Sequence, residues 1–415
     1  ACMRPYYYGP ISLSYLNIYF APYLENLSSK EIYQEAQNLI FVTSQNAYAR
    51  GGEPLAIDFN VYSYIPEDIK DVEAIGLGGK LTGKKYGAYL KEAQAFGNAL
   101  LDCWNRGDAA GNTFDFPIAS VHYQANFKAV VAEFEFLKKA SSVASCRKNI
   151  NFIKDLGETV CFSSQTHLQN TMQSSTSKDS AIIRINNLQS ISINLPHLLL
   201  RRGFKYKDVV LKNLENELIS ILSIALQAQE EKRYFMLSLA HADNSPLDEI
   251  FKIMLDGYSL VDIRTAKACI GFVGLSEFTK MAIGEPFYQG NLGFEFAQEF
   301  LVLFKKCLVD AGLFSDLYEI EENPELVAAY RLARIDSEKF YEARNYLNRD
   351  VNYGVTYSNG YSVSEDVVLD FEKRVHLERV FQAILSSNSP TLKPFGKGVS
   401  SQQILQLLSE NRLPV

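Results

Sequence analysis

The stretch CIGFVGL, residues Cys269–Leu275, is a continuous apolar run that contains no charged residue. Such a run is typical of a β-strand buried on both faces, as the strands of parallel sheets are. A long helix is predicted before it, over residues 207–234, and further helices are predicted after it, over residues 293–308 and 325–333. A buried strand set between helices indicates an α/β protein with a largely parallel sheet.

The same alternation of helices and strands is predicted for the first half of the chain. Ser28 and Glu31 stand at capping-box spacing before an apolar stripe of helical period, which predicts a helix that runs toward Arg50. The other predicted elements are helices over residues 86–105 and 127–139, strands over residues 55–64, 113–123, 147–153 and 194–200, and a last helix from about residue 366.

One segment does not fit this alternation. Residues 163–180 are dense in Ser, Thr, Gln and Asn and are predicted to form a long loop, which in a compact domain is usually functional or mobile. The sequence has no internal repeat, low-complexity tract or linker. Residues 1–415 are therefore expected to form one domain.

The composition restricts the class of function. The chain has 415 residues, of which 47% are hydrophobic and 21% charged, as in ordinary globular proteins. Its 41 basic and 48 acidic residues give a net charge of −7, which argues against nucleic acid or an anionic membrane as the main partner, because both require basic surfaces. No apolar run is long enough to span a bilayer, and no signal peptide is recognisable.

The cysteines and histidines indicate neither a disulfide scaffold nor a metal site. The six cysteines are sparse and none is spaced C-x-x-C, so free thiols in a reducing cytoplasm are expected. The five histidines show no H-x-x-x-H spacing, and no glycine motif of the P-loop or Rossmann type is present.

Cys146 stands apart because of its setting. It lies in SSVASCRKNINF, at a predicted junction between loop and strand, after several small residues and directly before Arg147. A neighbouring cation favours the reactive thiolate, whereas a buried and inert thiol is the commoner role for a cysteine. Both interpretations stay open on composition alone.

Seven segments together carry a family resemblance. They are RGGEPLAIDFN (Arg50–Asn60), NTFDFPIASVHY (Asn112–Tyr123), ASCRKNINF (Ala144–Phe152), INNLQSISINLP (Ile185–Pro196), CIGFVGLSE (Cys269–Glu277), NPELVAAYRLARID (Asn323–Asp336) and YSNGYSV (Tyr357–Val363). Each is a weak match alone, but all seven occur in the family's order over nearly the whole chain. The sequence resembles the catalytic subunit of anaerobic, class III ribonucleotide reductases, which are glycyl-radical enzymes.

The resemblance implies a ten-stranded α/β barrel of two parallel half-sheets, with a central finger loop that carries a thiyl-radical cysteine. Cys146 matches that catalytic cysteine and is expected on a loop inside the barrel, because a thiyl radical must be kept from water and stray hydrogen donors. Asn186 or Asn187 matches a substrate-binding asparagine, and Glu325 matches a glutamate placed to accept from the ribose hydroxyls. These residues equally fit plain roles in turns or at a solvated helix start.

The activity implied by the resemblance is reduction of ribonucleoside triphosphates to deoxyribonucleotides for DNA replication, with formate or a thiol system as the reductant. In the family a radical S-adenosylmethionine activase generates the glycyl radical, and nucleotide effectors bind near the interface of a homodimer. A cytoplasmic enzyme with these partners is expected, without a role for nucleic acid or membrane.

Several family features do not occur in these residues. The family has an H-D motif, a second cysteine and an ATP-cone regulatory domain upstream, and a four-cysteine zinc site and an R-x-x-G-Y radical glycine downstream. None occurs in the 415 residues, which open at Ala1, and Gln189 replaces a family glycine. The chain is therefore expected to lack both termini of the complete enzyme and to be inactive alone, unless a separate C-terminal polypeptide supplies the radical glycine.

Two other interpretations remain. The first is a non-catalytic relic of the family that binds nucleotides or dimerises, which the polar segment 163–180 and Gln189 favour. The second is another glycyl-radical enzyme, such as a relative of pyruvate formate-lyase. Such a relative would lack the N-N…N-L-P and P-E…Y-R-x-A segments.

Overall fold

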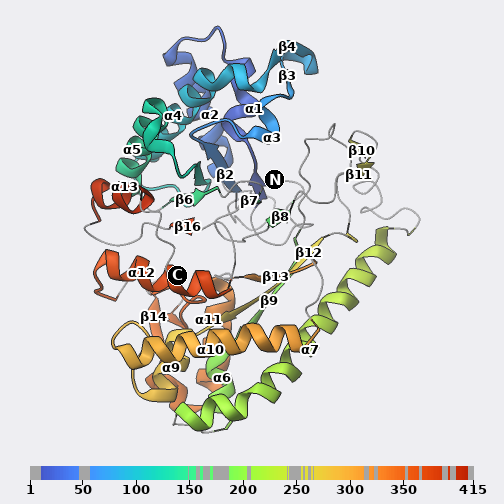
Figure 1. The fold of residues 1–415 in the computed structure, drawn as a ribbon, viewed down its shortest axis with the longest axis vertical. Helices are drawn as coiled ribbons and strands as arrows, with labels where there is room; N and C mark the ends of the chain where they lie inside the picture. The colour runs from blue at the N-terminus through green and yellow to red at the C-terminus, as the bar shows by residue number, and fades with distance from the viewer. Residues whose placement is uncertain are drawn as a thin grey trace. The chain divides into compact units, whose positions relative to one another are not determined.

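The computed structural model describes most of the chain as two compact units (Figure 1). The first unit comprises Ala1–Ser164, Gln169–Ile182 and Asn388–Arg412, and the second comprises Gln165–Leu168, Ile183–Ser387 and Leu413–Val415. The described residues are 11–45, 57–147, 149–155, 159–161, 169–171, 187–202, 207–240, 242, 254–255, 258–259, 263–264, 266–312, 317–321, 326–350, 354–363, 367–385, 391–392 and 399–409.

The first unit is built on a five-stranded sheet with the order β1-β2-β5-β6-β16. Its strands are β1 (Ile11–Leu13), β2 (Ile57–Tyr62), β5 (Ile118–Tyr123), β6 (Ile150–Lys154) and β16 (Thr391–Leu392). The first four are parallel, and β16 pairs with β6 in the antiparallel direction. Tyr62 of β2 lies beside His122 of β5, which lies beside Ile153 of β6. The carboxyl ends of these three strands therefore meet at one edge of the sheet.

Helices and two hairpins complete the first unit. They are α1 (Leu16–Phe20), α2 (Ser29–Ser44), α3 (Glu67–Lys70), α4 (Leu90–Arg106), α5 (Val131–Cys146), α13 (Ser401–Ser409), the 3₁₀ helices η2 (Ala21–Tyr23), η4 (Leu77–Gly79), η5 (Tyr86–Tyr89) and η6 (Phe127–Ala129), and the hairpins β3 (Glu73–Ile75)–β4 (Leu81–Lys85) and β7 (Thr159–Cys161)–β8 (Gln169–Thr171). The predicted capping box is confirmed at the start of α2, where Ser28 and Glu31 each accept from the other's backbone N–H. Helix α4 packs against α2 and α5. Its Trp104 is fully buried and donates from the indole N–H to the Pro117 carbonyl at 3.0 Å.

The second unit is built on a three-stranded parallel sheet with the order β13-β12-β9. Its elements are β9 (Asn187–Asn194), α6 (Leu195–Leu200), α7 (Lys207–Ala240), the hairpin β10 (Met254–Leu255)–β11 (Tyr258–Ser259), β12 (Lys267–Val273), α9 (Leu275–Ile283), α10 (Asn291–Asp310), β13 (Tyr318–Glu321), α11 (Leu326–Lys339), η8 (Tyr341–Asn345), the hairpin β14 (Asn348–Asp350)–β15 (Gly354–Thr356) and α12 (Phe371–Leu385). Helices α7 and α10 lie side by side in Figure 1 and bury leucines and phenylalanines against β12. None of the described helices is both long and apolar enough to cross a membrane.

The α/β class and the central strand are confirmed. The run CIGFVGL forms most of β12, which is buried from Ala268 to Val273. The predicted strand over residues 194–200 is wrong, because β9 ends at Asn194 and α6 begins at Leu195. Pro196 lies in the first turn of α6, where its fixed φ and missing N–H are tolerated.

The ten-stranded barrel and the single domain stay predictions. The described strands form one five-stranded sheet, one three-stranded sheet and four two-stranded hairpins. Most of the polar segment 163–180 lies outside the described residues.

Candidate functional site

Cys146 is the last residue of α5, and its side chain is exposed. The prediction that it lies on a loop shielded from water is therefore wrong. The small residues before Cys146 suggested a loop, but they continue the buried face of the helix, which extends beyond its predicted end near residue 139. The buried residues of this last part are Ala140, Ser141, Val143 and Ala144.

Arg147 has a structural role beside Cys146. Its guanidinium donates to the carbonyls of Asn105, near the end of α4, and Gly111, at 3.0 and 2.9 Å. These bonds satisfy carbonyls at the end of α4 that have no partner within the helix. Cys146 and Arg147 directly precede β6 and so lie at the amino-terminal edge of the sheet. Ligands of open α/β sheets bind at the opposite edge.

The predicted substrate-binding residues are only partly described. Asn187 is the first residue of β9, at the amino-terminal end of that strand, and it belongs to a different unit from Cys146. Asn186 and Glu325 lie outside the described residues. That these four residues share one site therefore stays a prediction.

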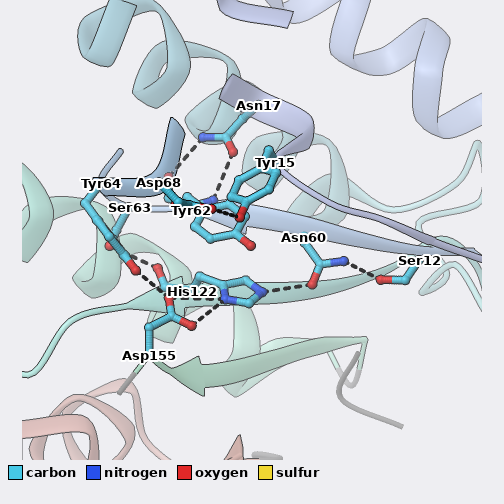
Figure 2. A network of polar contacts seen from close by, with 10 residues as sticks. All are labelled: Ser12, Tyr15, Asn17, Asn60, Tyr62, Ser63, Tyr64, Asp68, His122 and Asp155. Carbon is cyan, nitrogen blue, oxygen red and sulfur yellow. Dashed lines mark hydrogen bonds and ion pairs between the residues drawn. The ribbon is translucent and has the colours of Figure 1, made fainter. Parts of the chain in front are cut away.

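Polar side chains lie together at the carboxyl ends of β2, β5 and β6, and we call this set the His122 network (Figure 2). Its members are Ser12, Tyr15, Asn60, Tyr62, Tyr64, Asp68, His122 and Asp155. His122 is fully buried. Its Nδ1 lies 2.9 Å from Oδ1 of Asp155, and its Nε2 lies 2.8 Å from Oδ1 of Asn60. The Tyr64 hydroxyl donates to Oδ2 of Asp155 at 2.7 Å.

Both ring nitrogens of His122 face hydrogen-bond acceptors. Asn60 keeps its oxygen toward the ring because its Nδ2 donates to Oγ of Ser12 at 2.6 Å and to the Leu13 carbonyl at 3.4 Å. The imidazole is thus held between the Asp155 carboxylate and the Asn60 amide. The Tyr62 ring stacks on the imidazole with centroids 4.2 Å apart.

Tyr62 connects His122 to a second tyrosine. Its ring stacks on that of Tyr15 with centroids 5.0 Å apart, and the Tyr15 hydroxyl donates to Asp68. The Tyr62 hydroxyl is buried without a hydrogen-bond partner among the described residues. Burial raises the pKa of Tyr15, Tyr62 and Tyr64, so these phenols stay protonated near neutral pH.

A second polar set lies at the carboxyl end of β9, and we call it the Asp336 cluster. Asp336 of α11 is fully buried and accepts from three side chains. Asn194 Nδ2 lies 2.8 Å and the Tyr357 hydroxyl 3.0 Å from Oδ2, and His197 Nδ1 lies 2.6 Å from Oδ1. Asn194 also caps α6, since its side-chain oxygen accepts from the His197 N–H at 3.3 Å. The Asn194 side chain thus caps the start of α6 and donates to the Asp336 carboxylate.

Glu277 of α9 lies near the carboxyl end of β12 and is also buried. It accepts from the Ser358 hydroxyl at 2.7 Å, from the Ser358 N–H and from the Asn348 amide. Burial raises the pKa of Glu277, although these donors oppose the shift. Asn359, next to Ser358, has a buried side-chain oxygen without a partner among the described residues.

The sequence holds a signal for these residues. Asn194, His122 and Glu277 lie in or next to the segments NLP, SVHY and GLSE, where a strand ends and a loop or helix begins. In each of the two parallel sheets such positions lie at the carboxyl edge, where ligands bind. Within the described residues, no group of three or more His, Cys, Asp or Glu side chains is placed to hold a metal ion.

Comparison with known families fits this architecture. The family model of the anaerobic ribonucleoside-triphosphate reductases matches residues 2–389. The chain belongs to this family. No curated protein matches it in sequence.

Solved structures of anaerobic ribonucleotide reductases share the fold. One covers 97% of this chain at 14% identity with a TM-score of 0.65, and 60% of its own length is matched. The Thermotoga maritima enzyme with MES in the active site gives 97% coverage, 16% identity and a TM-score of 0.64, with 65% of its length matched. Its complex with dATP and CTP covers 92% of this chain at 16% identity with a TM-score of 0.58, and 59% of its own length is matched. The chain therefore spans about 60% of the length of these structures.

Proposed function

We propose that this chain is the nucleotide-binding core of an anaerobic ribonucleotide reductase, which converts ribonucleoside triphosphates to deoxyribonucleotides. The observation that carries the proposal is the family match over residues 2–389. Structures similar to this chain were determined with dATP and CTP, and with dATP in the specificity site. We therefore expect CTP to bind as a substrate and dATP as an effector.

The polar sets at the strand ends are suited to a sugar. The Asp336 cluster and Glu277 offer amide, hydroxyl and carboxylate groups at the carboxyl ends of β9 and β12. Ligand pockets of enzymes combine apolar walls with a few such fixed polar groups. We propose that these side chains orient the ribose.

The radical chemistry depends on other components. The proposed partners are a radical S-adenosylmethionine activase, formate or a thiol reductant, a second copy of this chain and a polypeptide that carries the radical glycine. The thiyl role of Cys146 stays a prediction, and its exposed side chain lacks the protection from water that a thiyl radical requires.

Calorimetric titration of the full chain tests nucleotide binding. CTP and dATP are each titrated into the protein, and dATP is titrated again in the presence of CTP. Two separate sites are expected, so dATP should still bind when CTP is saturating. Absence of binding for both nucleotides would contradict the proposal. Inorganic tripolyphosphate is the control, because binding of equal strength would show that only charge is recognised.

A second candidate is a family member that binds nucleotides without reducing them, and the exposed position of Cys146 favours it. The two candidates differ in turnover. The chain is combined anaerobically with activase, S-adenosylmethionine, reductant and a polypeptide carrying the radical glycine, and deoxycytidine nucleotides are measured. Product formation supports the reductase, whereas nucleotide binding without product supports the second candidate.

A further inference from the structure

His197 and Asp336 form a dyad whose chemistry is not used by the proposed function. Nδ1 of His197 lies 2.6 Å from the carboxylate of Asp336, which is fully buried. Among the described residues, Asp336 has three hydrogen-bond donors around it and no acceptor, so its hydrogen bonds are satisfied by the ionised form. Nδ1 of His197 is therefore the protonated nitrogen in the neutral ring, and the lone pair is left on Nε2.

The imidazole of this dyad is partly accessible. The His197 side chain is 29% exposed, and Nε2 has no hydrogen-bond partner among the described residues. The His197 and Phe340 rings pack edge to face, with centroids 5.5 Å apart. The ring is thus held by Asp336 at Nδ1 and by an aromatic contact, while the described residues leave Nε2 without a partner. A buried carboxylate that orients an imidazole in this way is the arrangement that makes histidine a general base.

We propose that the His197–Asp336 dyad is a proton-accepting site for a ribose hydroxyl of the bound nucleotide; this rests on the proposed function. The hydroxyl O–H bond breaks, its proton forms an N–H bond at Nε2, and the imidazolium is stabilised by the Asp336 carboxylate. The proton returns by the reverse step, so no oxidant or reductant is needed. His197 acts as the catalytic residue, and Asp336 positions it.

The surrounding charges favour a hydroxyl over a phosphate. The buried charged groups near the carboxyl ends of β9 and β12 are the carboxylates of Asp336 and Glu277. The buried cations of the second unit are engaged elsewhere, since Arg233 donates to the carbonyls of Ile263 and Ala266, and Arg374 to that of Val363. A phosphate would be repelled by the two carboxylates, whereas a neutral hydroxyl would not.

Modification by diethyl pyrocarbonate tests this assignment, because the reagent attacks unprotonated, accessible imidazole nitrogens. The full chain is treated with and without CTP, and the modified histidines are identified by peptide mass spectrometry. His197 should react and His122, which is fully buried, should not. With CTP at about ten times its dissociation constant, about a tenth of the sites stay free, so the rate at His197 should fall about tenfold. His376, exposed on α12, is the internal control and should keep its rate.

Four results separate the possible outcomes. Protection of His197 by CTP but not by inorganic tripolyphosphate supports the proposal. Protection by tripolyphosphate alone would show that His197 contacts phosphate. Binding of CTP in calorimetry without protection of His197 would show that the nucleotide binds elsewhere. Either result overturns the inference while leaving the proposed function intact. Absence of CTP binding overturns both.

A variant pair extends the test to turnover in the reconstituted system. His197→Asn keeps a donor close to the Nδ1 position for Asp336 and removes Nε2, so CTP binding should persist while kcat falls about 10²–10⁴-fold. His376→Asn is the matched control and should leave both unchanged. Equal kcat in His197→Asn and in the unchanged chain would refute the catalytic role.

Discussion

A Cβ atom on Gly274 would lie only 2.5 Å from Cγ and Cδ of Pro196. Gly274 directly follows β12, and Pro196 lies in the first turn of α6, so the absence of a side chain lets the helix start pack against the strand end. Asn194 and His197 flank Pro196. Their position beside Asp336 therefore depends on this close approach.

Gly274→Ala should destabilise the protein more than Gly284→Ala. Both glycines have positive φ, 81° and 91°, so either alanine costs about 1–2 kcal/mol of backbone strain. Nothing lies within 4 Å of a Cβ at Gly284, whereas the clash with Pro196 should add about 1–3 kcal/mol at Gly274. Urea unfolding of the two variants measures the difference. Equal losses of stability would show that the contact between Pro196 and Gly274 is not tight.

His122→Ala should destabilise the first unit strongly. The substitution removes both hydrogen bonds of the ring and leaves the Asp155 carboxylate without its histidine partner. Breaking a buried pair in this way costs about 3–5 kcal/mol. His376→Ala, on an exposed histidine, should change the unfolding free energy by less than about 0.5 kcal/mol. A loss below about 1 kcal/mol in His122→Ala would contradict the pairing of His122 with Asp155.

Cys146 should react with iodoacetamide well before Cys103 and Cys307. Cys146 is exposed, whereas burial raises the pKa of the other two thiols to about 11. At about pH 8 only about one in a thousand of the buried thiols is a reactive thiolate, and access to it is blocked. Peptide mass spectrometry after short exposures gives the order, and the urea-unfolded chain, in which all thiols should react together, is the control. Early labelling of Cys103 in the folded chain would be inconsistent with its burial.

The stability of the first unit should fall at alkaline pH. Burial raises the pKa of Tyr15, Tyr62 and Tyr64, and the carboxylates Asp68 and Asp155 raise those of Tyr15 and Tyr64 further. The unfolded phenols titrate near pH 10, so above about pH 10 the folded state binds more protons than the unfolded state and the unfolding free energy declines. Below about pH 10 the three phenols are protonated in both the folded and the unfolded state, so they do not change the unfolding free energy with pH. Unfolding measured at rising pH checks this, and Tyr64→Phe should weaken the decline.

Local signals in the sequence predicted much of the fold. The capping box at Ser28, the apolar run of β12 and the helical period of α7 each report the structure of neighbouring residues, and all three are confirmed. The end of α5 was missed because Ala and Ser are compatible with both a loop and a closely packed helix face. Whether a loop or a helix forms there depends on burial against other elements, which the neighbouring residues in the sequence do not report.

The candidate site was less accessible to sequence reasoning. Asp336 and His197 are 139 positions apart, and only the fold shows that they meet. The motif match pointed to Asn187, at the start of β9, and gave no role to Asn194, at the other end of the strand, which donates to Asp336. A motif identifies a strand, but the direction of the strand decides which of its ends carries the polar groups.

The order of the strands has a consequence for synthesis of the chain. Strand β16 and helix α13, from residues 391–392 and 401–409, complete the first unit, although every other described element of that unit precedes residue 172. Residues 187–385, with the described elements of the second unit, leave the ribosome in between. During translation the edge of β6 therefore stays unpaired until β16 has been synthesised. An exposed strand edge of this kind can pair with other chains, so the yield of correctly folded protein should depend on how quickly the ribosome reaches residue 391.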